Sequence, residues 1–239
     1  RRYFGLLRLN VDGSLDSSFH CYDMERIDYN RCYVDNVLAL PDGKIIITSN
    51  TAEYCLLRLH ANGSLDKALC TDLANKQSPG GYASISMCVL QPDGKLLVKG
   101  NFTRFNGYAA HSLVRLNADG SMDEAFLQAV SRSITAEEIK RVTIQPDGKI
   151  IVAGNTFSGG ARYHAAIARY TADGHLDESF GSNGITTTDI DTHTNLSDTY
   201  YGVALQADGK ILACGQTGLY AIKLTDEKMA LVRYDQNGA

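Results

Sequence analysis

The sequence predicts an all-β fold, a β-propeller built from four-stranded antiparallel blades. Two short phrases, each with the chemistry of a β-hairpin, recur and alternate strictly along the 239 residues. The turn glycine of the first phrase recurs after 51, 54 and 61 residues, and the arginine of the second after 50, 57, 54 and 64. Two hairpins per repeat give four strands, and four-stranded units with a period of roughly 40–50 residues or slightly more are typical of propeller blades.

The first phrase reads Gln145-Pro146-Asp147-Gly148-Lys149, with apolar residues on both sides. Proline suits the second position of a type I turn, and aspartate can bond its own backbone there. Glycine then supplies the left-handed residue of a three-residue hairpin loop. The flanks are rich in Val, Ile and Leu without clean alternation, which predicts strands buried on both faces. Further copies stand at residues 40–44, 91–95 and 206–210.

The second phrase reads LRLNVDGSLD at residues 7–16 and is again strand, Asx-Gly turn and strand. It returns at 57–66, 114–123 and 168–177, and part of it at 232–238. Its recurring charged residues are Arg8, Arg58, Arg115, Arg169, Arg233, Asp16, Asp66, Asp123 and Asp177. A ring of carboxylates would suit calcium. However, a residue repeated once per blade does the same job in every blade, so we interpret these pairs as structural staples.

The alternation makes residues 1–239 one propeller region with about 4.5 blades visible. The second hairpin of a preceding blade is expected at 5–16, and blades at approximately 35–66, 86–123, 140–177 and 201–239, the last one incomplete. We expect them to be part of a larger ring or arc, within a processed chain or a piece of a longer one. The alternative is that the N-terminal hairpin completes the last blade.

The connections carry further expectations. In the link before the third of these blades, Thr135-Ala136-Glu137-Glu138 fits a capping box and predicts a short helix. Three phenylalanines in the links are expected to fill the gaps between blades: Phe19, Phe126 and Phe180.

Composition excludes some partners and limits others. The net charge is −4, the pI is about 5.9 and no basic run occurs, so nucleic acid is not expected as a partner. No apolar run approaches the ~20 residues that span a bilayer. Alignment of the repeats places Cys55, Cys88 and Cys214 at small core positions. Cys21 and Cys32 lie in one link and could pair, which would require an oxidising compartment.

The residue patterns predict no catalytic, cofactor or metal site. The six cysteines show no CxxC spacing and the histidines no HxxxH or HExxH pair, which disfavours zinc. No GxSxG elbow or Walker loop is present, and no GxGxxG follows a strand.

The paired phrases QPDGKIIVAG (145–154) and ARYTADGHLDESFG (168–181) strongly resemble the delta-60 repeat, a family of bacterial β-propellers, and the resemblance covers essentially the whole chain. The departures are Ala207 for the turn proline, Thr48-Ser49 for Ala-Gly, and Cys70 after Leu69 where Phe-Gly would be expected. The resemblance implies a module of a larger exported, surface or envelope protein or of a secreted effector, and no shared catalytic residues.

Three functions are compatible with this pattern. The first is a non-catalytic scaffold for protein–protein interaction, with other proteins or further domains of the same chain as partners. The second is a glycan- or ligand-binding propeller, and the third an enzyme with a site in the central funnel. Function is expected in the long connections 101–111, 155–164 and 216–228, where variation is concentrated. The candidate interaction residues there are Phe102, Arg104, Phe105, Tyr108, Arg162, Tyr163 and Tyr220.

Overall fold

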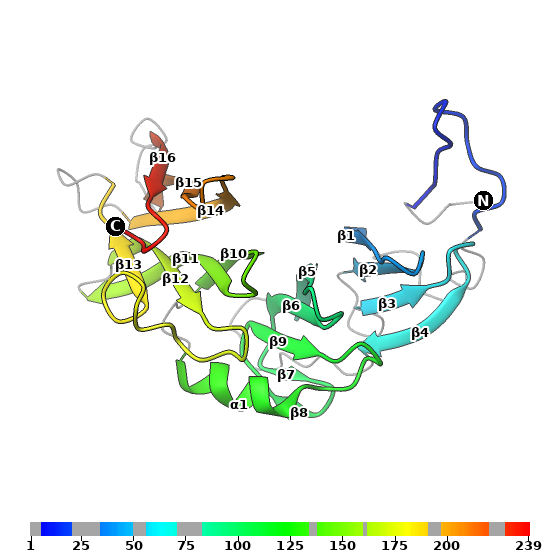
Figure 1. The fold of residues 1–239 in the computed structure, drawn as a ribbon, viewed down its shortest axis with the longest axis horizontal. Helices are drawn as coiled ribbons and strands as arrows, with labels where there is room; N and C mark the ends of the chain where they lie inside the picture. The colour runs from blue at the N-terminus through cyan, green and yellow to red at the C-terminus, as the bar shows by residue number, and fades with distance from the viewer. Residues whose placement is uncertain are drawn as a thin grey trace. The chain divides into compact units, whose positions relative to one another are not determined.

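The structure, a computed structural model, is built almost entirely of antiparallel β-sheets, which confirms the predicted fold class (Figure 1). It describes residues 6–20, 34–49, 56–70, 83–133, 138–159, 162–190, 197–219 and 228–239. These residues belong to two compact units, Arg1–Asp123 and Glu124–Ala239. The predicted union of all blades in one region, and its place in a larger ring or arc, stay predictions.

The first unit holds two sheets and a small hairpin. The four-stranded sheet runs in the order β1 (Val34–Ala39), β2 (Ile45–Ser49), β3 (Leu56–Leu59) and β4 (Leu65–Cys70). The three-stranded sheet comprises β5 (Ser84–Leu90), β6 (Leu96–Asn101) and β9 (Leu113–Leu116). Between β6 and β9 the chain inserts a two-stranded hairpin of β7 (Arg104–Phe105) and β8 (Tyr108–Ala109).

The second unit opens with helix α1 (Glu124–Ser133) and continues with two sheets. The four-stranded sheet comprises β10 (Glu138–Ile144), β11 (Ile150–Gly159), β12 (Arg162–Tyr170) and β13 (Ile185–Thr188). The three-stranded sheet comprises β14 (Ser197–Leu205), β15 (Ile211–Leu219) and β16 (Lys228–Tyr234).

The turn of the first phrase is built as predicted. Gly148 has a φ of 85°, and its amide donates to the carbonyl of Gln145 at 2.9 Å. The Asp147 carboxylate accepts the amide of Lys149 at 3.1 Å, so the side chain closes the turn on its own backbone. In the strand that follows, Ile150 and Ile151 are both 0% exposed, which confirms burial on both faces.

The return leg of the second phrase differs from the prediction. Only at residues 65–70 is it a full strand, β4; elsewhere it is an isolated bridge, such as Tyr170–Leu176. After Asp16 and Asp177, a serine two residues later accounts for the bend. The Asp177 carboxylate accepts the hydroxyl of Ser179 at 2.6 Å and its amide at 3.2 Å, which turns the chain away from the sheet. After Asp66 and Asp123 alanine stands at that position, and the chain continues as β4 after the first and as α1 after the second.

Two consequences follow for the links. The fourth strand of the β10–β13 sheet is β13, which lies within the predicted link 178–200. The predicted helix at 135–138 is wrong in position: the helix of this link is α1, which begins directly after Asp123, a residue type favoured at the helix N-cap. Glu138 starts a strand, and residues 134–137 lie outside the described part of the chain.

Neighbouring sheets of the second unit pack face to face. Their shared core contains Ile151, Ala153, Ala165, Ile167, Phe180, Tyr200, Ile211, Ala213 and Tyr234. Side chains alternate along β15, so Cys214 lies on the face opposite to Ala213. Cys214 is therefore exposed and its predicted core position is wrong, whereas Cys88 is buried as predicted.

The predicted filling of gaps by link phenylalanines is confirmed for Phe126 and Phe180, both 0% exposed. Each ring lies under the turn glycine of the following second phrase. A Cβ added to Gly174 would lie 2.8 Å from the Phe126 ring, and one added to Gly238 2.7 Å from Phe180. Only a glycine fits above each ring, because the neighbouring phrases approach so closely.

This contact gives a stability prediction. Gly174→Ala combines a positive φ of 96° with a clash against Phe126, and should lower the free energy of unfolding by about 2–4 kcal/mol. Gly148→Ala is the matched control, because its φ is also positive, at 85°, but the nearest atom to its added Cβ is the Cβ of Ala172 at 3.5 Å, an ordinary van der Waals contact. The control should lose about 1–2 kcal/mol in urea denaturation. Equal losses for the two variants would show that the ring contact is unimportant.

Candidate functional site

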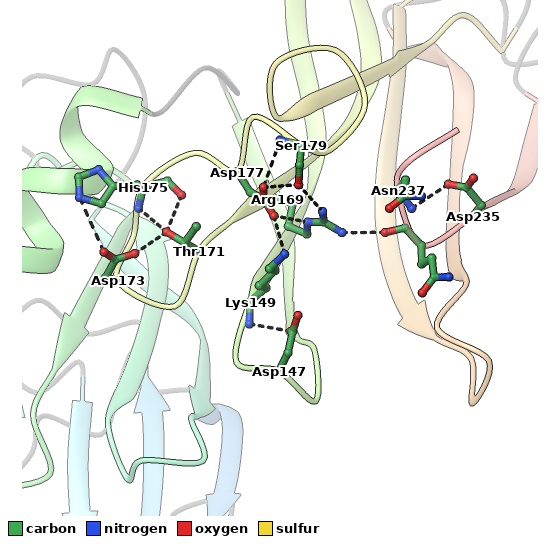
Figure 2. Close-up of polar contacts among 11 residues, drawn as sticks. Asp147, Lys149, Arg169, Thr171, Asp173, His175, Asp177, Ser179, Asp235 and Asn237 are labelled. Carbon is green, nitrogen blue, oxygen red and sulfur yellow. Dashed lines mark hydrogen bonds and ion pairs between the residues drawn. The ribbon is translucent and has the colours of Figure 1, made fainter.

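The recurring charged residues form one polar network per repeat, drawn for Arg169 in Figure 2. Arg169 lies on β12, with its Nε donating to the Asp177 carboxylate at 2.7 Å. Its Nη1 donates to the backbone carbonyl of Gln236 at 2.7 Å, in the turn of the next second phrase. The guanidinium also lies 4.7 Å from the centre of the Phe180 ring. One side chain therefore joins its own turn, the ring under the next turn, and that turn's backbone.

The carboxylate of Asp177 has a second cation. Lys149 Nζ, from the first phrase of the same sheet, lies 2.9 Å from Asp177 Oδ2. Sequence reasoning missed this role and assigned the lysine only to its turn. The signal was present, because lysine ends all four copies of the first phrase as regularly as aspartate ends the second.

The same geometry recurs in the first unit. The arginine–carboxylate distances are 2.7 Å for Arg8–Asp16, 2.6 Å for Arg58–Asp66 and 2.9 Å for Arg115–Asp123. The lysine contacts are 3.0 Å for Lys44–Asp66 and 2.8 Å for Lys95–Asp123. Arg8 and Arg58 reach the carbonyls of Ala61 and Ala118, each in the following second phrase, at 2.5 and 3.1 Å. The interpretation of these residues as structural staples is thereby confirmed.

These carboxylates are poorly suited to act as bases. The hydroxyl and amide of Ser18, followed by Arg8, lower the pKa of Asp16 to about 2. Burial alone would raise the pKa of Asp177, but hydrogen bonds from Ser179 and from the two cations outweigh it and hold that pKa well below its usual range. A group with so low a pKa accepts protons only in strong acid.

Within the described ranges, no three side chains of His, Cys, Asp or Glu are grouped closely enough to hold a metal ion. His175 lies 3.9 Å from Asp173, and both side chains are well exposed in a turn.

Two of the predicted interaction residues are wrong as surface contacts. Phe102 is 2% exposed and Phe105 is 0% exposed, and their rings pack against each other with centroids 5.6 Å apart. Their hydrophobic rings are buried beneath the β7–β8 hairpin, so neither can meet a partner. The sequence did not show this, because an aromatic residue in a connection suits a core anchor and a contact residue equally well.

Arg104 and Tyr108 lie on that hairpin and are both exposed. Asn106 and Gly107 form its two-residue turn, with φ values of 48° and 86°. Sequence reasoning missed the hairpin, although Asn-Gly is a strong short-range hairpin signal. Asn106 also donates to the carbonyl of Leu69 at 2.8 Å, which fixes the turn to the neighbouring sheet of the same unit.

The remaining candidates belong to the second unit. Arg162 is paired with Asp189 at 2.5 Å, and Tyr163 packs edge-on against Phe157 with ring centroids 5.6 Å apart. Both residues begin β12, so much of the predicted connection 155–164 is paired strand. Tyr220 lies outside the described residues.

The network yields a prediction on charge burial. Arg169 is 5% exposed and Asp177 8%. Removing the guanidinium in Arg169→Met leaves the carboxylate and the Gln236 carbonyl with fewer donors, and should cost about 3 kcal/mol of unfolding free energy in urea. Lys210→Met is the control, because its pair with Asp208 is solvated, and its transition midpoint should not move. A midpoint for Arg169→Met equal to that of the control would refute the staple.

A second prediction concerns acid. The folded-state pKa of Asp177 lies below the usual pKa of an aspartate, about 4, so its stabilisation is present above about pH 4 and is lost as the pH falls further. Asp177→Asn should therefore be less stable than the wild type near neutral pH, and the difference in unfolding free energy between the two proteins should shrink in acid. Urea unfolding between about pH 6 and pH 3 measures this gap. A gap that stays constant with pH would contradict the assignment.

Similarity to solved structures is low. PorZ, described as an essential bacterial surface component of the type-IX secretion system of Porphyromonas gingivalis, is 12% identical with a TM-score of 0.40, covering 84% of this chain and 26% of PorZ. The GH74 xyloglucanase from Xanthomonas campestris is 13% identical with a TM-score of 0.43, covering 98% of this chain and 32% of the enzyme. A hypothetical protein from Leishmania major is 15% identical with a TM-score of 0.39, covering 87% and 69%. The chain thus spans about a quarter of PorZ and about a third of the xyloglucanase.

No curated protein matches the chain significantly. A family model described as "Domain of unknown function (DUF5122) beta-propeller" matches residues 2–19, 40–68, 91–126 and 145–180. The first segment contains the second phrase, and each of the other three contains one copy of both phrases. The chain therefore belongs to the DUF5122 β-propeller family, which is the delta-60 repeat family that its sequence resembles.

Proposed function

We propose that this β-propeller domain is a non-catalytic scaffold for protein–protein interaction within a larger bacterial surface, secreted or envelope-associated assembly. The observation that carries the proposal is the β7–β8 hairpin, which presents Arg104 and Tyr108 on a rigidly anchored base. Arginine and tyrosine are enriched among the residues that dominate binding energy at protein interfaces.

The hairpin is held in place before any partner arrives. Phe102 and Phe105 anchor it from below, and Asn106 ties its tip to Leu69. Arg104 also donates to the carbonyl of Gly107 at 3.1 Å, so its side chain is held across the hairpin. Binding through preordered side chains loses little conformational entropy, which favours affinity.

The recurring charged residues support the same proposal, because their side chains already make structural contacts. In the described repeats the arginines, aspartates and first-phrase lysines hold neighbouring turns together. Recognition is therefore assigned to residues that differ from repeat to repeat, and Arg104 and Tyr108 are of this kind.

The cellular setting rests on the family resemblance alone, which implies exported, surface or envelope proteins and secreted effectors. Other proteins, or further domains of the same chain, are the proposed partners, without nucleic acid. Among the described residues no helix is long and apolar enough to cross a membrane.

A glycan-binding function is the second candidate, favoured by one specific pair. Phe157 is 47% exposed and is supported edge-on by Tyr163. An exposed aromatic ring held in this way offers a flat apolar face for stacking. A glycan array probed with the wild type and with Tyr163→Ala decides this candidate: a signal lost in the variant supports it, and an array without signal removes it.

The scaffold proposal predicts that Arg104→Glu combined with Tyr108→Ala weakens partner binding. Proteins cross-linked to the chain in its native source are identified, and each purified candidate is titrated against the wild type and the variant. Loss of two central contacts should weaken the true interaction at least tenfold, equivalent to about 1.4 kcal/mol.

The control for this experiment is Arg141→Glu combined with Tyr201→Ala. It changes the same residue types at exposed positions of the second unit, outside the recurring charged residues. Binding should be retained by the control and lost by the hairpin variant. Recovery of the monomer alone, or equal binding by all three proteins, would contradict the proposal.

A further inference from the structure

Five buried side-chain oxygen atoms of the second unit have no hydrogen-bond partner among the described residues. Two belong to the glutamines that open copies of the first phrase, Gln145 and Gln206, and the other three are Asp198 Oδ1, Thr217 Oγ1 and Asn155 Oδ1. Asp198 and Thr217 are 0% exposed, and Asn155 is 2% exposed. An unsatisfied buried acceptor costs free energy, and a carboxylate oxygen costs most because it carries charge.

The sheet register brings the oxygens of Asp198 and Thr217 together. Asp198 on β14 is directly opposite Thr217 on β15, so their side chains share one face with Cβ atoms about 4.5–5.5 Å apart. Although they face each other, the hydroxyl and the carboxylate do not hydrogen-bond. Both oxygens lack a partner, so one common third partner would satisfy the two together.

The third oxygen comes from the neighbouring sheet. Asn155 on β11 donates its Nδ2 to the hydroxyl of Thr199 at 3.0 Å. Thr199 follows Asp198 directly, and this bond leaves the Asn155 carbonyl oxygen as a spare acceptor. On the other side, Asp198 Oδ2 accepts the backbone amide of Ile190 at 2.9 Å. The carboxylate is therefore fixed by one oxygen and unpaired at the other.

A carboxylate, a hydroxyl and an amide carbonyl are the oxygen ligands that hard cations prefer. We propose that Asp198, Thr217 and Asn155 contribute to a binding site for a hard cation, with calcium as its probe, between the β10–β13 and β14–β16 sheets. The ion would supply the positive charge that the buried carboxylate lacks among the described residues. It would connect strands β11, β14 and β15, and so stabilise the junction of two sheets independently of any partner at the β7–β8 hairpin.

The test compares thermal unfolding of the full chain in a chelator and in millimolar calcium. The wild type should gain several degrees in calcium, because a ligand that binds only the folded state stabilises it. Asp198→Asn keeps an acceptor for the Ile190 amide but removes the charge. It should lose the calcium effect and, in chelator, be at least as stable as the wild type.

Two further variants keep the result interpretable. Thr217→Val removes one oxygen at constant shape and should weaken calcium affinity at least tenfold in calorimetry, without loss of the fold. Glu178→Gln changes an exposed carboxylate of the same unit and should respond to calcium as the wild type does. A wild type that does not respond to calcium, or a response that persists in Asp198→Asn, would overturn the proposal. Sensitized terbium luminescence that calcium displaces from the wild type and not from Asp198→Asn would support it.

Discussion

The rest of the structure depends on one interaction, in which an arginine side chain on one strand hydrogen-bonds to the turn of the next repeat. Arg169 binds its own aspartate, covers a phenylalanine ring and donates to a carbonyl in the following phrase. A β-sheet hydrogen-bonds along its strands, but nothing in the ladder fixes one sheet against another. The guanidinium supplies that fixation, because its planar fork can donate in several directions at once.

The hydrophobic contacts follow from this arrangement. The ring of Phe180 can lie under Gly238 only because the polar network holds the two turns at the required distance. Lys149 adds a second positive charge to a carboxylate that is largely withdrawn from water. Charged and apolar contacts therefore support each other at the junction of Arg169, Phe180 and Gly238.

Much of this arrangement could be predicted from the sequence, because turn chemistry is local. The left-handed Gly148 and its aspartate cap need no information beyond five residues. The path of the chain after each second phrase could not be predicted in the same way. It depends in part on whether a serine stands two residues after the aspartate, as Ser179 does for Asp177. Where alanine stands there, the chain forms a strand after Asp66 and a helix after Asp123, a difference that lies outside the phrase itself.

The candidate site was predictable only in part for a different reason. Local sequence does not show which side of a hairpin is covered, so Phe105 and Tyr108 were equally good candidates for a contact residue. The structure distinguishes them, because Phe105 is buried and Tyr108 is exposed. Lys149 was missed because its partner lies 28 residues further along the chain, and such pairs are defined only by the folded sheet.

The reach of the arginine has one more consequence, for cooperativity. The guanidinium groups of Arg8, Arg58 and Arg169 each join consecutive repeats, so coupling through these described contacts passes from one repeat to its neighbour. Such an array is close to a one-dimensional chain, in which a defect lowers the stability of its own junction and leaves distant junctions intact. One connection can therefore carry an insertion, as the β7–β8 hairpin does between β6 and β9, while the other repeats keep their fold.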